Sequence, residues 1–113
     1  MPNRGEVWKV VLTGSEGHEQ KGSRPALIFS VNELNHSGFR LVIAIPITSN
    51  TERLASRVYV DAPEGGLTEQ SAIMCEQILR LDIDKRLAQR LGTVTPKTMA
   101  KVGLKLIVLL GID

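Results

Sequence analysis

The sequence predicts a mainly-β protein of the α+β class, in which a strongly bent antiparallel sheet or small barrel is followed by one C-terminal helix. Short apolar runs bounded by turn residues recur up to residue 78. No helical pattern separates these runs, as the crossovers of a parallel sheet would require. An amphipathic pattern with helix-capping residues occupies the segment from residue 94 onward.

The chain of 113 residues suits a single domain over residues 1–113. Hydrophobic residues make up 42% and charged residues 23%, which excludes a low-complexity or disordered chain. The net charge of +2 permits an anionic partner. No apolar run is long enough for a membrane span, the N-terminus lacks the core of a signal peptide, and Cys75 has no second cysteine to pair with. We therefore expect a cytoplasmic protein without membrane contact.

The first two expected elements are a strand and a surface loop. Residues 5–12 are rich in β-branched and aromatic side chains, which predicts a strand with Val7 facing inward. Residues 13–23 contain three glycines and no apolar side chain. This segment cannot pack into a core, so it is expected to lie on the surface.

Four further apolar runs predict strands over residues 24–31, 40–48, 57–62 and 71–78. The first two are joined by a polar connection, and the last two by a turn-rich segment. Pro46 lies within the second of these runs. Because proline cannot donate a ladder hydrogen bond, we expect it at a sheet edge or a bulge.

The C-terminal segment predicts a helix that begins after Thr95 as N-cap, has Pro96 at its first position and ends near Gly111. Its apolar face consists of Met99, Val102, Leu106, Leu109 and Leu110, and a second face carries Lys97, Lys101 and Lys105. This helix is expected to pack on the sheet. A shorter helical turn is expected within residues 82–90.

Several common catalytic sites are absent from the sequence. It contains no phosphate-binding loop ending in Lys and Ser or Thr, no dinucleotide fingerprint and no nucleophile elbow. His18 and His36 are far apart and lack a metal-ligand spacing. Any catalysis is therefore expected to use ordinary polar side chains, without a metal or cofactor.

Arg24 and the segment 48–51, TSNT, are the first candidates for such chemistry. A guanidinium at the start of a buried strand is held in place and can offer several donors to a phosphate, although a solvated surface arginine fits the same position. Thr48 and Ser49 follow a strand and can hydrogen-bond a phosphodiester or simply form a turn.

The remaining candidates are polar groups in the loop and after the last strand. Glu19 can act as a general base or anchor the loop backbone, and His18 can transfer protons or simply lie exposed. Glu76 and Gln77 end a strand and can hydrogen-bond within the sheet. Cys75 is expected to be a small buried apolar residue and not a nucleophile.

Four segments together resemble the MazF/PemK/Kid family of toxin endoribonucleases: RGEVWKVVL (4–12), GHEQKGSRPALI (17–28), IPITSN (45–50) and CEQILRLD (75–82). The loop motif G-x-E-Q-x-G-x-R-P is the most specific of these. The resemblance implies a barrel related to the SH3 fold, a homodimer, and metal-independent cleavage of single-stranded RNA. It also implies an antitoxin whose acidic, flexible segment blocks the RNA groove.

The resemblance further implies roles for individual residues. Arg24 matches the catalytic arginine of the family and Thr48 its catalytic threonine. Glu19 and Gln20 match loop positions of the motif, with His18 as a secondary candidate, while Ser49, Glu76 and Gln77 match positions that line the substrate groove. Some members use an arginine at the position of Met74, which shifts the expected chemistry here toward Arg24 and Thr48.

RNA cleavage of this kind begins with attack of a ribose 2'-OH on the adjacent phosphorus and leaves a 2',3'-cyclic phosphate and a 5'-OH. It needs an oriented nucleophile and stabilisation of added negative charge, to which an arginine and a hydroxyl are suited. Two alternatives remain, because fold does not fix function. One is a toxin of the same fold that inhibits DNA gyrase, and the other is a non-catalytic RNA-binding barrel.

Overall fold

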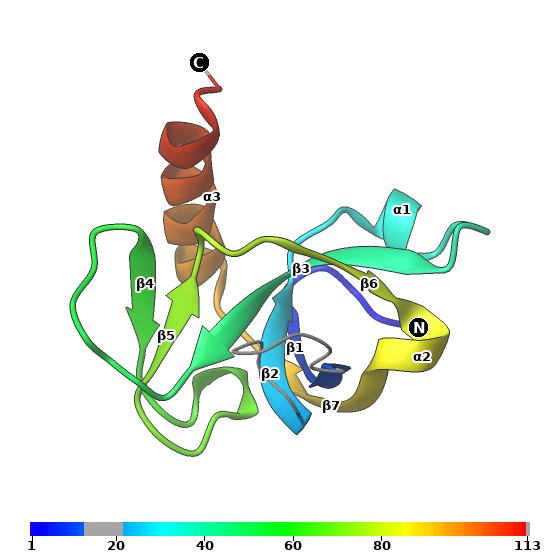
Figure 1. The fold of residues 1–113 in the computed structure, drawn as a ribbon, viewed down its shortest axis with the longest axis horizontal. Coiled ribbons are helices and arrows are strands. Elements are labelled where there is room, and N and C mark those ends of the chain that lie inside the picture. Colours follow the sequence, from blue (N-terminus) through cyan, green and yellow to red (C-terminus); the bar gives the residue numbers. More distant parts are fainter. Residues whose placement is uncertain (13–21, 113) are drawn as a thin grey trace.

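The computed structural model describes residues 1–12 and 22–112, in which a seven-stranded antiparallel sheet is followed by a C-terminal helix (Figure 1). The strands are Glu6–Leu12 (β1), Gly22–Ile28 (β2), Leu41–Thr48 (β3), Arg57–Val60 (β4), Ser71–Met74 (β5), Leu79–Asp82 (β6) and Leu87–Thr93 (β7). The helices are Asn32–Asn35 (α1), the 3-10 turn Glu64–Gly66 (η1), Ile83–Arg86 (α2) and Pro96–Leu110 (α3). The predicted fold class is confirmed.

The strands follow the order β4-β5-β3-β2-β1-β7, and β6 pairs with β3 away from this path. Apolar side chains form two buried clusters on this sheet. One contains Val7, Leu27, Ile45, Ile73 and Val102, and the other contains Val10, Ile28, Val42 and Leu81. The inward orientation predicted for Val7 is confirmed, since its side chain is fully buried.

β3 changes its partner along its length. It pairs with β6 from Leu41 to Ala44 and with β5 at Ile47 and Thr48, while β2 pairs with it on the other side. The expectation that Pro46 lies at a sheet edge or bulge is therefore wrong, because β3 is an interior strand. Pro46 falls between the two paired segments, where its missing N–H leaves no gap in either ladder.

The last strands differ most from the sequence prediction. The strand expected over residues 71–78 ends at Met74, and a turn follows before β6. The expected helical turn is present as α2, but residues 87–93 form β7, which the sequence did not reveal. β7 pairs with β1, a strand near the other end of the sequence. The side chains of β7 itself are half-buried or exposed, so they give no apolar pattern that predicts a strand.

The predicted caps of α3 are confirmed. The Thr95 hydroxyl accepts a hydrogen bond from the Thr98 N–H, and Gly111 ends the helix in the left-handed conformation with φ of 69°. Only the first half of the apolar face is buried, because Leu109 and Leu110 remain 43% and 55% exposed. The C-terminal half of α3 extends beyond the sheet (Figure 1). Within residues 1–12 and 22–112, no helix combines the length and apolarity needed to cross a membrane.

Candidate active site

The start of β2 and the end of β3 form a cleft of about 320 Å³. Ala26 pairs with Pro46 in the antiparallel ladder between these strands. Two more residues of the same register place Arg24 opposite Thr48, and both residues line the cleft. The cleft is lined by Ser23, Arg24, Pro25, Ile47, Thr48, Ser49, Leu67, Thr68, Glu69 and Ser71. The structure thus brings together Arg24, Thr48 and Ser49, as the sequence suggested.

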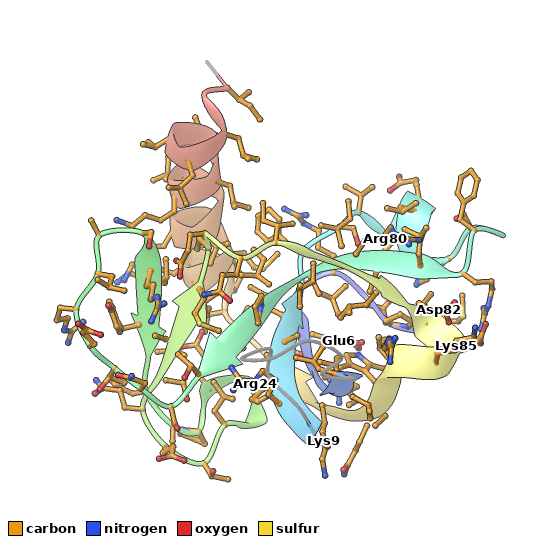
Figure 2. All side chains as sticks on the ribbon, viewed as in Figure 1. Glu6, Lys9, Arg24, Arg80, Asp82 and Lys85 are labelled. Atoms are coloured by element: carbon orange, nitrogen blue, oxygen red, sulfur yellow. The ribbon has the colours of Figure 1, made fainter. Side chains whose placement is uncertain are left out.

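Arg24 extends from β2 on the side where β3 ends (Figure 2). Its Nη1 is buried and has no hydrogen-bond partner among residues 1–12 and 22–112, and Arg24 forms no ion pair within these ranges. Burial lowers the pKa of the guanidinium below its ordinary value, although an arginine stays charged in a protein. A cation held in this way is well suited to a phosphate, which would supply the missing acceptors.

The Thr48 hydroxyl is oriented by the turn that follows β3. Thr48 Oγ1 accepts a hydrogen bond of 3.1 Å from the Asn50 N–H. In the part of the chain that the structure describes, this hydroxyl donates to no acceptor. The hydroxyl can therefore donate its proton to a ligand in the cleft, which Thr48 and Arg24 both line.

The third wall of the cleft comes from residues 67–69, which follow the glycine turn η1. Gly66 has φ of +74°, and a Cβ at this position would lie 2.0 Å from the carbonyl oxygen of Leu91 in β7. The turn thus needs glycine for both its conformation and its close approach to β7. Their close packing fixes the direction in which Leu67, Thr68 and Glu69 leave η1.

Glu76 and Gln77 do not line this cleft. Glu76 follows β5 and forms an ion pair of 2.8 Å with Arg57 Nη2, and it accepts 2.7 Å from Ser56 Oγ. Burial alone would raise the pKa of Glu76, but the hydrogen bonds from Arg57 and Ser56 lower it to about 2. Gln77 Nε2 lies 3.3 Å from the same carboxylate. Both residues therefore belong to a cluster beside β4.

The other candidates divide between those placed by the structure and those outside it. His18, Glu19 and Gln20 lie outside the described residues. Cys75 is fully buried, which confirms the predicted burial, and burial raises the pKa of its thiol to about 11. No group of three or more His, Cys, Asp or Glu side chains arranged to hold a metal occurs within residues 1–12 and 22–112.

The structure adds residues to the site that sequence reasoning missed. Thr68, Glu69 and Ser71 line the cleft, and Glu69 is the one carboxylate among its described lining residues. These residues lie in and just after a segment that looks like an ordinary turn in the sequence. Only the tertiary fold brings this turn beside Arg24.

Comparison with known families now identifies the chain. The family described as PemK-like, MazF-like toxin of type II toxin-antitoxin system matches residues 3–110. The chain belongs to this PemK/MazF toxin family.

Curated members of the PemK/MazF family are similar to the chain over most of its length. It is 32% identical to endoribonuclease PemK of Escherichia coli over 100 residues, which cover 88% of this chain and 74% of the relative. It is also 32% identical to endoribonuclease toxin ChpB of Escherichia coli (strain K12) over 105 residues, which cover 91% of this chain and 89% of the relative.

Solved structures of the PemK/MazF family share the fold. MazF from Deinococcus radiodurans superposes with a TM-score of 0.84 at 31% identity and covers 98% of this chain and 97% of its own. An endoribonuclease in complex with its cognate antitoxin, from Mycobacterial species, gives a TM-score of 0.82 at 29% identity, with 100% and 98% covered. This PemK/MazF-family protein therefore shares the fold of these relatives.

Proposed function

We propose that the protein is a toxin endoribonuclease that cleaves single-stranded RNA without a metal ion. The observation that supports this most strongly is the cleft that Arg24 and Thr48 both line from the adjacent strands β2 and β3. Membership of the PemK/MazF family supports the same function, since its curated relatives are named endoribonucleases. The proposed substrate atom is a phosphodiester phosphorus seated between the guanidinium and the hydroxyl.

In the proposed reaction the ribose 2'-oxygen attacks the adjacent phosphorus while the bond from phosphorus to the 5'-oxygen breaks. The 2'-OH proton passes to a base, and the leaving 5'-oxygen gains a proton. The products are a 2',3'-cyclic phosphate and a 5'-OH. Arg24 stabilises the negative charge that builds up on the nonbridging oxygens, and Thr48 donates a hydrogen bond to one of them.

Proton transfer is assigned to Glu19, His18 or Glu69. Glu19 and His18 precede Arg24 closely in the sequence, and Glu69 contributes a carboxylate to the lining of the cleft. Gln20 and Ser49 are proposed to bind or shape the substrate. Comparing the pH profile of cleavage for the variants Glu19→Gln and Glu69→Gln identifies the base, since its loss removes the acidic limb of the profile.

The proposal includes regulation and assembly. The chain acts as a homodimer in the cytoplasm, and a cognate antitoxin with an acidic, flexible segment neutralises it. One of the similar solved structures is an endoribonuclease in complex with its cognate antitoxin, and another is MazE-MazF from Deinococcus radiodurans. Glu76 and Gln77 are proposed to contact the RNA beyond the cleft, or to hold the structure around it.

The test is cleavage of a long RNA by purified protein in the presence of EDTA, with the product ends mapped. We expect cleavage at defined short sequences and cyclic phosphate ends. Arg24→Ala should abolish cleavage, whereas Arg80→Ala, an exposed arginine of β6 outside the cleft, should retain it. Cleavage by the Arg24→Ala protein contradicts the assignment. A gyrase supercoiling assay in parallel detects the alternative activity.

A further inference from the structure

Thr48 and Tyr59 lie in one row across three strands of the sheet. Thr48 of β3 pairs with Ala72 of β5, and Ala72 in turn pairs with Tyr59 of β4. Residues that pair directly across antiparallel strands project their side chains to the same face of the sheet, and neighbouring strands lie about 4.8 Å apart. Tyr59 therefore stands two strands, or roughly 10 Å, from Thr48, with the small side chain of Ala72 between them.

The connection that leaves β3 after Thr48 is folded by two consecutive hydrogen bonds between side chain and backbone. The Asn50 N–H donates 3.1 Å to Thr48 Oγ1, and the Glu52 N–H donates 3.0 Å to Asn50 Oδ1. Each bond closes a tight turn of the kind that threonine and asparagine form with the N–H two residues later. The placement of the Thr48 hydroxyl is therefore linked to the backbone as far as residue 52.

The Tyr59 hydroxyl holds the far end of this connection. It donates 2.6 Å to the Glu52 carbonyl oxygen and accepts 2.7 Å from the Leu54 N–H. The Leu54 carbonyl oxygen lies farther away, at 3.4 Å, so the single phenolic proton goes to Glu52. A chain of three hydrogen bonds thus runs from the Tyr59 hydroxyl through Glu52 and Asn50 to the Thr48 hydroxyl.

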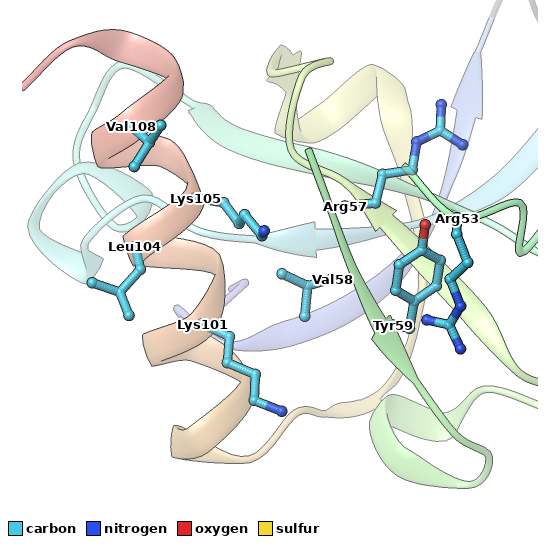
Figure 3. Close-up of a pocket in the computed structure, with 8 residues that line it drawn as sticks. All are labelled: Arg53, Arg57, Val58, Tyr59, Lys101, Leu104, Lys105 and Val108. Atoms are coloured by element: carbon cyan, nitrogen blue, oxygen red, sulfur yellow. The ribbon is translucent and has the colours of Figure 1, made fainter. Parts of the chain in front are cut away.

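The ring of Tyr59 is held in its turn. Its backbone is paired within the sheet, and Arg53 lies over its ring, with 4.1 Å from the guanidinium carbon to the ring centre (Figure 3). On this side Tyr59 lines a groove of about 500 Å³ beside α3. The groove is a second surface, and none of its lining residues lines the cleft that contains Arg24. The Tyr59 hydroxyl is therefore a fixed point against which the connection after β3 is placed.

We infer that Tyr59 is a positioning residue for RNA cleavage, which orients the Thr48 hydroxyl through the chain of hydrogen bonds between them. The role of Thr48 in cleavage rests on the proposed function, whereas the contacts from Tyr59 to Thr48 do not. Neither Tyr59 nor Asn50 is among the described residues that line the cleft. Tyr59 therefore acts through Thr48 and not by touching the phosphate.

The Asn50 N–H determines how the Thr48 hydroxyl can be used. By donating to Oγ1, it holds the Thr48 side chain in one of its staggered rotamers and leaves the hydroxyl proton free for a ligand in the cleft. If the Tyr59 hydroxyl is lost, the backbone of residues 50–54 is no longer held at Glu52 and Leu54. The hydrogen bond to Thr48 then forms only part of the time, so the hydroxyl meets the substrate less often in the productive direction.

The first test is steady-state cleavage of a fluorogenic RNA by Tyr59→Phe, which removes one oxygen and keeps the ring. We expect kcat to fall by about tenfold or more, because small displacements of a reacting group are costly. Binding of the same RNA with a 2'-deoxynucleotide at the cleavage site, which lacks the nucleophile, should change by less than about twofold. An unchanged kcat overturns the inference, as does a loss of binding that equals the loss of kcat, since Tyr59 would then contact the RNA itself.

Ser37→Ala is the matched control for the loss of a hydroxyl that ties a connection to itself. Ser37 Oγ donates 2.8 Å to the Leu34 carbonyl oxygen and accepts 3.2 Å from the Phe39 N–H, in the connection between α1 and β3. This variant should keep kcat within about twofold. Thermal unfolding of both variants verifies that the fold is retained.

A double-mutant cycle tests whether Tyr59 acts through Thr48. Thr48→Val removes the hydroxyl that the chain of hydrogen bonds orients. In this background Tyr59→Phe should lower the residual kcat by less than about twofold, because no hydroxyl remains to be positioned. A fall in kcat as large as that in the wild-type background overturns the inference, since Tyr59 would then act on another group.

Hydrogen exchange followed by NMR examines the contacts without RNA. Tyr59→Phe should speed exchange of the Asn50, Glu52 and Leu54 amides by about tenfold, while the amides of β1 stay within about twofold. Unchanged exchange at Asn50 and Glu52 overturns the inference even if kcat falls. If the wild-type protein does not cleave RNA, the proposed function fails, and the exchange result alone decides whether Tyr59 orients Thr48.

Discussion

Replacing Arg24 by methionine tests two effects of the guanidinium separately. One is its cost to the stability of the fold, and the other is its contribution to RNA cleavage. Methionine has a similar length and no charge. The buried Nη1 of Arg24 has no partner in the described residues, and an unsatisfied buried donor costs about 1–3 kcal/mol. Because the guanidinium is only partly buried, we expect Arg24→Met to raise the free energy of unfolding by about 1 kcal/mol, at the low end of this range.

The same substitution should remove activity. Loss of a donor that stabilises transition-state charge lowers rates by about 10²–10³, and loss of a whole arginine at a phosphoryl centre by about 10³–10⁵. We therefore expect Arg24→Met to lower kcat/KM for RNA cleavage by about 10³ or more. Arg24→Lys keeps the charge but not the fork of donors and should lose less, about 10–100-fold.

Urea denaturation and a fluorogenic RNA substrate measure the two effects on the same preparations. Arg80→Met is the matched control on an exposed position of β6, where stability should change by less than about 0.5 kcal/mol. A destabilisation of more than about 1 kcal/mol in Arg24→Met would refute the reasoning. It would mean that the folded chain already satisfies the guanidinium and does not hold it ready for a ligand.

Three further outcomes are expected. Gly66→Ala should destabilise the protein by about 2–4 kcal/mol in urea denaturation, since its Cβ would meet the Leu91 carbonyl at 2.0 Å, whereas Gly38→Ala, with open space around it, should change little. Glu76→Gln should lower the free energy of unfolding by about 1–2 kcal/mol at neutral pH. Folding lowers the pKa of Glu76 from 4.5 to about 2, so the stabilisation by its carboxylate is fully present above pH 4.5. The unfolding free energies of variant and wild type should therefore converge as the pH falls toward 2. Cys75 should resist iodoacetamide in the native protein at pH 8 but react after unfolding in urea, since burial raises the pKa of its thiol to about 11.

The elements that local patterns specify were predicted well. α3 carries its own N-cap, its proline at the first position and its C-terminal glycine, so its ends could be read directly at Thr95 and Gly111. β1 and β3 are buried runs with turn residues at their ends. In each case the signal lies within the element itself.

The elements that depend on distant partners could not be predicted in the same way. β7 has no alternating apolar pattern and exists because β1 supplies its hydrogen bonds. Pro46 looked like a mark of a sheet edge, but the change of partner along β3 accommodates it inside the sheet. Neither the pairing of β7 with β1 nor the change of partner along β3 can be predicted from the local sequence.

In the candidate site too, some residues could be predicted from local sequence and others depend on contacts between distant segments. Arg24 and Thr48 could be selected because each stands at the end of an apolar run, and the resemblance to a known family named both. Glu69 could not, since it enters the cleft only through the packing of the glycine turn on β7. The ion pair of Glu76 with Arg57 was also missed, because only the pairing of β4 with β5 brings the turn after β5, which contains Glu76, next to Arg57.

The change of partner along β3 has a mechanical consequence for the two surfaces. The hairpin of β4 and β5 joins the rest of the sheet through only two residue pairs of β3, one of which includes Thr48. The same hairpin supplies Val58 and Tyr59 to the groove beside α3 and Ser71 to the cleft. The shape of both hollows therefore depends on the same short ladder between β3 and β5, even though the hollows share no lining residue.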